Sequence, residues 1–126
     1  MENKWKSKNF IEALKNTING IKYSIKTQNN LRIELVIAVI VITASIILKL
    51  SKIEFAIVIM IIFLVLFAEL INTAIEETIN LITEDYNEKA KIVKDISAGA
   101  VTIVSISSII IGIIIFSDKI IKIFIK

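Results

Sequence analysis

The sequence predicts an all-α membrane protein, with an amphipathic helix at the membrane surface followed by three transmembrane helices. Hydrophobic residues make up 56% of the 126 positions and charged residues only 21%. The apolar runs are too long and continuous for the alternating strands of a barrel. The chain also has no proline and only three glycines, so little in its composition would interrupt a helix. We therefore expect one membrane domain that covers residues 1–126.

The amphipathic helix is expected over residues 8–27. Its apolar side chains recur at helical spacing while lysines occupy other positions around the helix, which is typical of a segment lying in the membrane interface. No small-residue cleavage pattern follows, which argues against a cleavable signal peptide. A basic segment can also indicate nucleic-acid binding, but the apolar chain behind it favours the membrane surface, with no nucleic acid as partner.

The three membrane helices are expected at residues 33–50, 54–82 and 96–117. The first contains the charge-free stretch 35–48, and the second is long enough that its end should emerge from a hydrocarbon core about 30 Å thick. Residues 83–95 are rich in charge and predict a loop in water. Small residues along the third helix should let another helix pack closely, namely Ala98, Thr102, Ser105 and Gly112.

The distribution of positive charge predicts the orientation of these helices. Ten of the fifteen Lys and Arg residues lie in residues 1–32 and in the loop at 83–95, which should therefore be cytoplasmic. With three spans, Glu34, the 68–80 stretch and the Lys94-Asp95 pair would all reach the same leaflet. We therefore expect a functional site at the cytoplasmic face of the membrane.

The stretch 68–80, AELINTAIEETIN, carries the candidate chemistry. Glu69, Asn72, Thr73, Glu76 and Asn80 fall on one helical face. An ionised side chain near mid-bilayer costs roughly 2.5–3.5 kcal/mol, so these carboxylates are functional candidates, although hydrogen bonds to neighbouring helices are the simpler alternative. Spaced in this way, the two glutamates can serve as proton acceptor and metal ligand.

The residues that follow this stretch offer charge for a ligand. Lys94 supplies a positive charge for phosphate, and Asp95 could orient the Lys94 side chain or a ligand hydroxyl. The alternative is an ordinary charged start of a helix, where an aspartate is favourable in any case. Glycine-rich nucleotide motifs and kinase catalytic loops do not occur.

The residue types that are missing limit the chemistry further. The chain has no cysteine and no histidine, which excludes disulfides, thiol nucleophiles, histidine acid-base catalysis and the usual zinc sites. Any metal should be a hard cation that prefers oxygen ligands, such as Mg²⁺. The residues alone thus predict a site at a membrane face without indicating its substrate.

The stretch AELINTAIEETIN, followed after a charged segment by AKIVKDISAGAV, closely resembles the prokaryotic diacylglycerol kinase and undecaprenol kinase family. The resemblance covers nearly the whole chain. It implies a homotrimer in a bacterial inner or plasma membrane that transfers the γ-phosphate of MgATP to a lipid hydroxyl at the cytoplasmic face. The composition, rich in Lys, Ile and Asn, is similar to low-GC Gram-positive members, which implies undecaprenol as acceptor and diacylglycerol next.

The resemblance also implies a role for individual residues. Glu69 would be the general base, supported by Asn72, and Glu76 a magnesium ligand. Arg32, Glu34 and Glu69 would bind the lipid. The nucleotide would meet Glu76 and a further set of residues, namely Asp85, Tyr86, Asn87, Lys94 and Asp95.

Two positions depart from the family pattern. Gln28 stands where a second metal-binding glutamate is expected, and Asn80 stands where an aspartate is usual. The Gln28 amide oxygen can still coordinate a metal, but without the charge the affinity for the metal should fall. The alternatives to an active kinase are a degenerate or non-catalytic homologue and a small proton- or ion-conducting oligomer with Glu69 as its relay. A conductor would not consume ATP and would not need Lys94.

Overall fold

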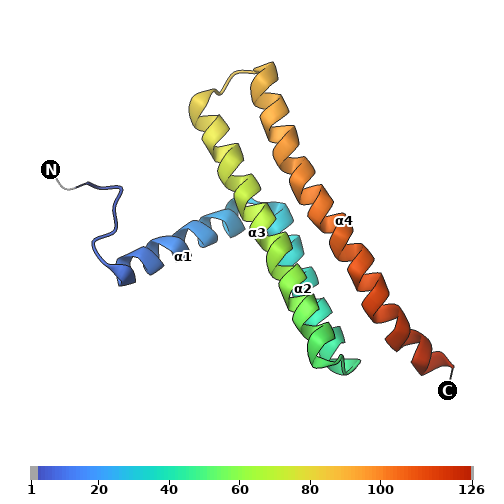
Figure 1. The fold of residues 1–126 in the computed structure, drawn as a ribbon. Helices are drawn as coiled ribbons and strands as arrows, with labels where there is room; N and C mark the ends of the chain where they lie inside the picture. The colour runs from blue at the N-terminus through green and yellow to red at the C-terminus, as the bar shows by residue number, and fades with distance from the viewer. Residues whose placement is uncertain (1–2, 126) are drawn as a thin grey trace.

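The structure is a computed structural model, and it describes residues 3–125; positions 1, 2 and 126 of the expected domain lie outside this range. Four helices follow one another in this part of the chain, α1 (Phe10–Thr27), α2 (Asn29–Ile47), α3 (Lys52–Ile82) and α4 (Glu88–Phe124), without a strand among them (Figure 1). Of these, α2, α3 and α4 are long and apolar enough to cross a membrane. The all-α fold class predicted from the sequence is confirmed.

Helix α1 projects away from the other three helices (Figure 1). Its first turn is capped by Asn9, whose side chain accepts a hydrogen bond from the backbone N–H of Glu12 at 2.9 Å. Much of its apolar face is exposed, beginning with Phe10 at 77%. A hydrogen bond to Glu77 of α3, together with the negative charge of that carboxylate, raises the pKa of the Tyr23 hydroxyl.

Two short connections separate α1, α2 and α3. The break between α1 and α2 is confined to Gln28, whose extended backbone lets the chain change direction before α2 begins at Asn29. Between α2 and α3, Lys49 has a positive φ of 52° and Ser51 caps α3. The Ser51 side chain accepts from Glu54 N, while the Glu54 carboxylate accepts from Ser51 N, which forms a capping box.

The connection between α3 and α4 is shorter than the sequence suggests. We expected a loop over residues 83–95 and a third span over 96–117, but α4 already begins at Glu88 and continues to Phe124. Asn87 starts it by accepting a hydrogen bond from Ala90 N at 3.1 Å, and Lys91 forms an ion pair with Asp95 one turn further on. Five of the seven charged residues of this segment therefore belong to the first two turns of a helix, and only Glu84 and Asp85 remain in the loop.

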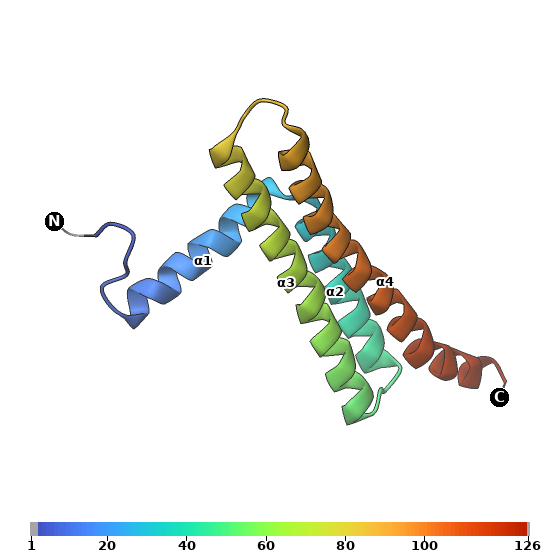
Figure 2. The same ribbon diagram turned by 45° about the horizontal axis from the view of Figure 1, so that its top comes forward.

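Helix α3 is the centre of the packing. Both α2 and α4 lie against it (Figure 2), and α1 contacts α2 and α3. Among the described residues, no Cα atom of α2 lies within 8 Å of a Cα atom of α4. Near its far end α4 is held by an ion pair of 2.8 Å between Lys119 and Glu54. Many isoleucines are exposed, as expected for helices that face lipid, while the most buried side chains include Glu69 and Ser45.

Candidate active site

A row of polar side chains runs along α3 where it faces α2 and α4. Glu69 is only 2% exposed, and Asn72 and Thr73 are buried beside it. The 3.6-residue period puts Glu69, Asn72 and Glu76 on successive turns of one side of the helix. The Thr73 hydroxyl donates to the Glu69 carbonyl at 3.0 Å, so it is satisfied within α3. The carboxylates and the amide remain to face the neighbouring helices.

Asn72 links α3 to α4 through a buried hydrogen bond that the sequence did not reveal. The Ser97 hydroxyl donates to Asn72 Oδ1 at 2.7 Å, and Asn72 Nδ2 donates to Glu76 Oε1 at 3.2 Å. Ser97 lies one helical turn after Lys94 and is 6% exposed. The other small residues of this helix predict only close packing, and the nearest signal for Ser97 in the sequence is that it shares a helical face with Lys94.

Glu69 lies next to two polar residues of α2. Asn30 forms a side-chain hydrogen bond with the Glu69 carboxylate. The Glu34 side chain, one turn further along α2, lies in the neighbourhood of the Glu69 carboxylate. The Oε2 atom of Glu34 is buried and has no hydrogen-bond partner among the described residues. A buried carboxylate oxygen without a donor is costly, so a ligand hydroxyl or a water there would be stabilised.

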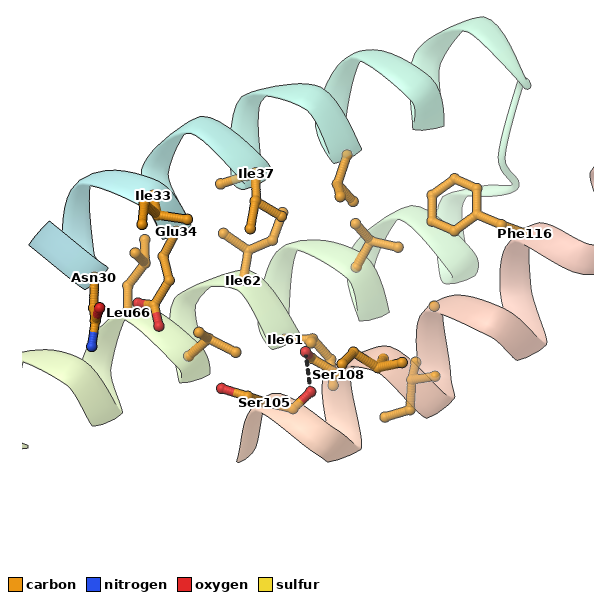
Figure 3. A pocket seen from close by; sticks show the side chains of 17 residues that line it. Asn30, Ile33, Glu34, Ile37, Ile61, Ile62, Leu66, Ser105, Ser108 and Phe116 are labelled. Atoms are coloured by element: carbon orange, nitrogen blue, oxygen red, sulfur yellow. Dashed lines mark hydrogen bonds between the residues drawn. The ribbon is translucent and has the colours of Figure 1, made fainter. Parts of the chain in front are cut away.

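An apolar cavity begins beside these residues. It has a volume of about 510 Å³ and is lined by α2, α3 and α4. Figure 3 shows Asn30 and Glu34 at one end and Phe116 toward the other, with isoleucines between them. Ser105 and Ser108 also line the wall, but the Ser108 hydroxyl donates to the Ser105 carbonyl at 2.7 Å. The cavity is thus polar at the Glu34 end and almost entirely apolar elsewhere.

The residues expected to meet a nucleotide are only partly gathered. Lys94 Nζ donates to Asn80 Oδ1 at 2.8 Å, which holds its ammonium group one turn beyond Glu76 on α3. Asp95 is instead paired with Lys91 on the exposed surface of α4. In the short loop, Asn87 caps α4, the Asp85 carbonyl accepts from Thr83, and Tyr86 is 81% exposed. Arg32 is exposed on α2.

The donor set suits Mg²⁺ only when other ligands contribute. Residues 3–125 contain no cluster of three or more Asp, Glu, His or Cys side chains that could hold a metal ion by themselves. Mg²⁺ commonly keeps several waters and binds through one or two carboxylates together with substrate phosphates. Glu76 can supply such a carboxylate. Gln28 stands at the junction of α1 and α2, and its side chain makes no capping hydrogen bond there.

Known proteins resemble this sequence over most of its length. The sequence profile of the family described as prokaryotic diacylglycerol kinase matches residues 15–116. A protein of Synechocystis sp. named diacylglycerol kinase is 37% identical over 113 residues, which cover 88% of this chain and 65% of that protein. The undecaprenol kinase of Bacillus subtilis is 36% identical over 110 residues, covering 87% of this chain and 89% of the relative.

Proposed function

Because this chain belongs to the prokaryotic diacylglycerol kinase family, a family of lipid kinases, we propose that it transfers the γ-phosphate of ATP to the hydroxyl group of a membrane lipid. The observation that carries the proposal is the position of Glu69. Its carboxylate is buried on α3 and hydrogen-bonded to Asn30, and that asparagine lies at the polar end of an apolar cavity. A lipid with a hydroxyl head group and an apolar chain would match this arrangement, with its hydroxyl near the carboxylate and its chain in the cavity.

Glu69 is the proposed general base for the acceptor hydroxyl. The carboxylate accepts the proton as the hydroxyl oxygen attacks the γ-phosphorus, the bond from that phosphorus to the β,γ-bridging oxygen breaks, and ADP leaves. Asn30 orients the carboxylate through its hydrogen bond, and Asn72 supports the geometry on the next turn of α3. Glu34, with its unpaired oxygen, and Arg32 are proposed to bind the polar head of the lipid.

The nucleotide is proposed to bind along α3 and α4 toward the loop. Lys94 contacts phosphate, and Asp95 and the loop residues Asp85, Tyr86 and Asn87 meet the rest of ATP. Glu76 would hold Mg²⁺ together with the phosphates, and Gln28 would be a weak further ligand. Mg²⁺ held there would supply neutralisation of phosphate charge; phosphoryl transfer depends mainly on such neutralisation and on positioning, so no glycine-rich loop is required.

Undecaprenol is the preferred acceptor in this proposal, and diacylglycerol is the next candidate. The cavity is lined mainly by branched aliphatic side chains, which suit a branched polyprenyl chain. The relative named undecaprenol kinase also aligns over more of its own length than the relative named diacylglycerol kinase does. The two acceptors differ in their apolar portions, so competition between them tests this preference.

We further propose that the site lies at the cytoplasmic face of a bacterial cell membrane and that the protein is a homotrimer. The excess of Lys and Arg in residues 1–32 and near the loop supports the orientation. The open side of the three-helix arrangement supports additional subunits, because one chain encloses a nucleotide and a lipid only partly.

Purified protein in mixed micelles with labelled ATP and either undecaprenol or diacylglycerol tests the proposal. Glu69→Gln should lower product formation at least about 100-fold, because a general base typically contributes that much. Glu76→Gln should lower activity and raise the Mg²⁺ requirement. Glu77→Gln is the matched control, since it makes the same exchange on α3 at a residue that contacts Tyr23 instead. Equal activity in all four proteins would refute the site assignment.

A further inference from the structure

Ser97 uses its hydroxyl differently from the other serines and threonines of the described helices. Where those side chains donate a hydrogen bond, the acceptor is a carbonyl three or four residues earlier in the same helix. Ser97 donates instead across the interface, to Asn72 Oδ1 at 2.7 Å, from a position only 6% exposed. The Ser97 hydroxyl of α4 is therefore hydrogen-bonded to a different helix, α3.

This bond determines which way the Asn72 amide points. An ionised Glu76 carboxylate can only accept, so the amide nitrogen of Asn72 must face it, and the 3.2 Å bond from Nδ2 to Glu76 Oε1 agrees. The amide oxygen then faces α4, where it needs a donor. Ser97 supplies that donor. Without the hydroxyl, the amide oxygen would be buried without a partner, and rotation of the amide would turn oxygen toward the carboxylate.

Glu76 lies between two hydrogen bonds that join α3 to α4. One turn before it, Asn72 meets Ser97, and one turn after it, Asn80 accepts from Lys94 at 2.8 Å. The first bond acts on Glu76 directly, because Asn72 occupies one of its two carboxylate oxygens. No described residue forms a hydrogen bond with the other oxygen, Oε2, so that oxygen can bind a ligand. The direction of the carboxylate is thus set from α4 through an asparagine.

We propose that Ser97 is a positioning residue that fixes the Asn72 amide so that Glu76 keeps one oxygen directed to the metal-bound nucleotide. The inference rests on the proposed function, in which Glu76 binds Mg²⁺ together with ATP. Groups that orient a metal ligand commonly change metal affinity 10- to 100-fold when they are removed. Loss of the Ser97 hydroxyl should therefore weaken metal-nucleotide binding by about tenfold.

Two variants of nearly identical shape separate the hydroxyl from packing. Ser97→Thr keeps the hydroxyl and adds a methyl group, while Ser97→Val has the same bulk without the hydroxyl. Binding of Mn²⁺ with a non-hydrolysable ATP analogue, followed by electron paramagnetic resonance, measures the site without turnover. The valine variant should show a dissociation constant about tenfold higher than the threonine variant. Equal constants for the two would overturn the proposal.

A second measurement follows the solvent exchange of the Asn72 side-chain amide. In ¹⁵N NMR spectra, the side-chain NH₂ of Asn72 should exchange with solvent slowly in the wild type and in Ser97→Thr, and faster in Ser97→Val. Unchanged exchange in the valine variant would also contradict a positioning role. If the added methyl group prevents folding, Ser97→Ala, which adds no atoms, must show the same loss of binding and of protection.

Glu76→Gln distinguishes failure of this inference from failure of the proposed function. If Glu76→Gln binds the Mn²⁺ complex as tightly as the wild type, Glu76 is not a metal ligand, and both the proposed metal site and the role of Ser97 are wrong; the kinase activity itself is tested separately by product formation in mixed micelles. If Glu76→Gln loses binding while Ser97→Thr and Ser97→Val bind equally, only the role of Ser97 is wrong. Loss of binding in Glu76→Gln and Ser97→Val, with retention in Ser97→Thr, supports both.

Discussion

Gln28 and Asn80 are the residues at which this chain replaces an expected carboxylate with an amide. Gln28 forms the single-residue break between α1 and α2, and Asn80 accepts a hydrogen bond from Lys94. Both exchanges remove negative charge from the neighbourhood of the proposed metal-nucleotide site. Their consequences should differ, because one position is proposed to meet the metal and the other meets a lysine.

Gln28→Glu should strengthen metal binding. A carboxylate is a better Mg²⁺ ligand than an amide oxygen, so the Mg²⁺ concentration that gives half-maximal activity should fall by about five- to tenfold. Kinase assays across a Mg²⁺ series at saturating ATP measure this. Asn29→Asp, which adds the same charge at the next residue, should change the Mg²⁺ dependence little. An unchanged Mg²⁺ requirement in Gln28→Glu would argue against a metal contact at this position.

Asn80→Asp should weaken ATP binding. The Lys94 ammonium is held by a neutral oxygen at 2.8 Å, so its charge stays available for phosphate, whereas a carboxylate would neutralise it. We expect the KM for ATP to rise by about two- to fivefold, with a smaller change in kcat. Asn80→Ala is the control, because it removes the hydrogen bond to Lys94 without adding a negative charge at residue 80. If both variants raise the KM equally, charge at residue 80 is not the cause.

For individual residues of the site, the sequence reveals the residue types and their spacing along each helix. Periodicity alone puts Glu69, Asn72 and Glu76 on one side of a helix, and the structure buries the first two. The partner of Asn72 could not be predicted, because Ser97 is 25 residues away and its role depends on the relative rotation of α3 and α4. The unpaired oxygen of Glu34 likewise appears only when three helices are packed together.

Among the elements, α3 begins with a reciprocal pair of capping hydrogen bonds. Its capping box joins Ser51 and Glu54, and Glu54 also pairs with Lys119 near the end of α4. Ser51→Ala should destabilise the protein by about 1 kcal/mol, since it removes the N-cap acceptor. Thermal unfolding in detergent micelles measures the loss, and Ser51→Thr should restore most of it. A fully stable Ser51→Ala protein would mean that the Glu54–Lys119 ion pair and packing hold this end without the cap.

The helices themselves were predictable because a membrane span must satisfy its own backbone hydrogen bonds, so long apolar runs without proline have few alternatives. Their ends were harder to predict. The charged residues 88–95 suggested a loop, but Asn87 caps them and Lys91 pairs with Asp95, so they extend α4 by two turns. Local capping and side-chain pairing decided this boundary, and hydropathy contains no information about either.

For the whole molecule, orientation is the property that can be tested most directly. The chain has no cysteine, so single cysteines can be introduced without a background. In intact cells, a membrane-impermeant maleimide should label Lys52→Cys, at the α2–α3 turn, and leave Glu84→Cys, in the α3–α4 loop, unlabelled until the cells are lysed. The reverse pattern would place the proposed site on the outer face. Equal labelling of both would contradict three complete spans.

The separation of α2 from α4 has a consequence for how such an enzyme would meet its lipid. The apolar cavity is lined by α2, α3 and α4, with α3 in contact with both other helices. Because α2 and α4 do not contact one another, the side of the cavity opposite α3 is not closed by helix packing. An acceptor could then enter by diffusion within the bilayer, and the phosphorylated product could leave by the same route without passing through water. The turnover rate would depend on the mole fraction of acceptor among the surrounding lipids. Adding inert lipid to the membrane would therefore slow the enzyme, even when the total amount of acceptor is unchanged.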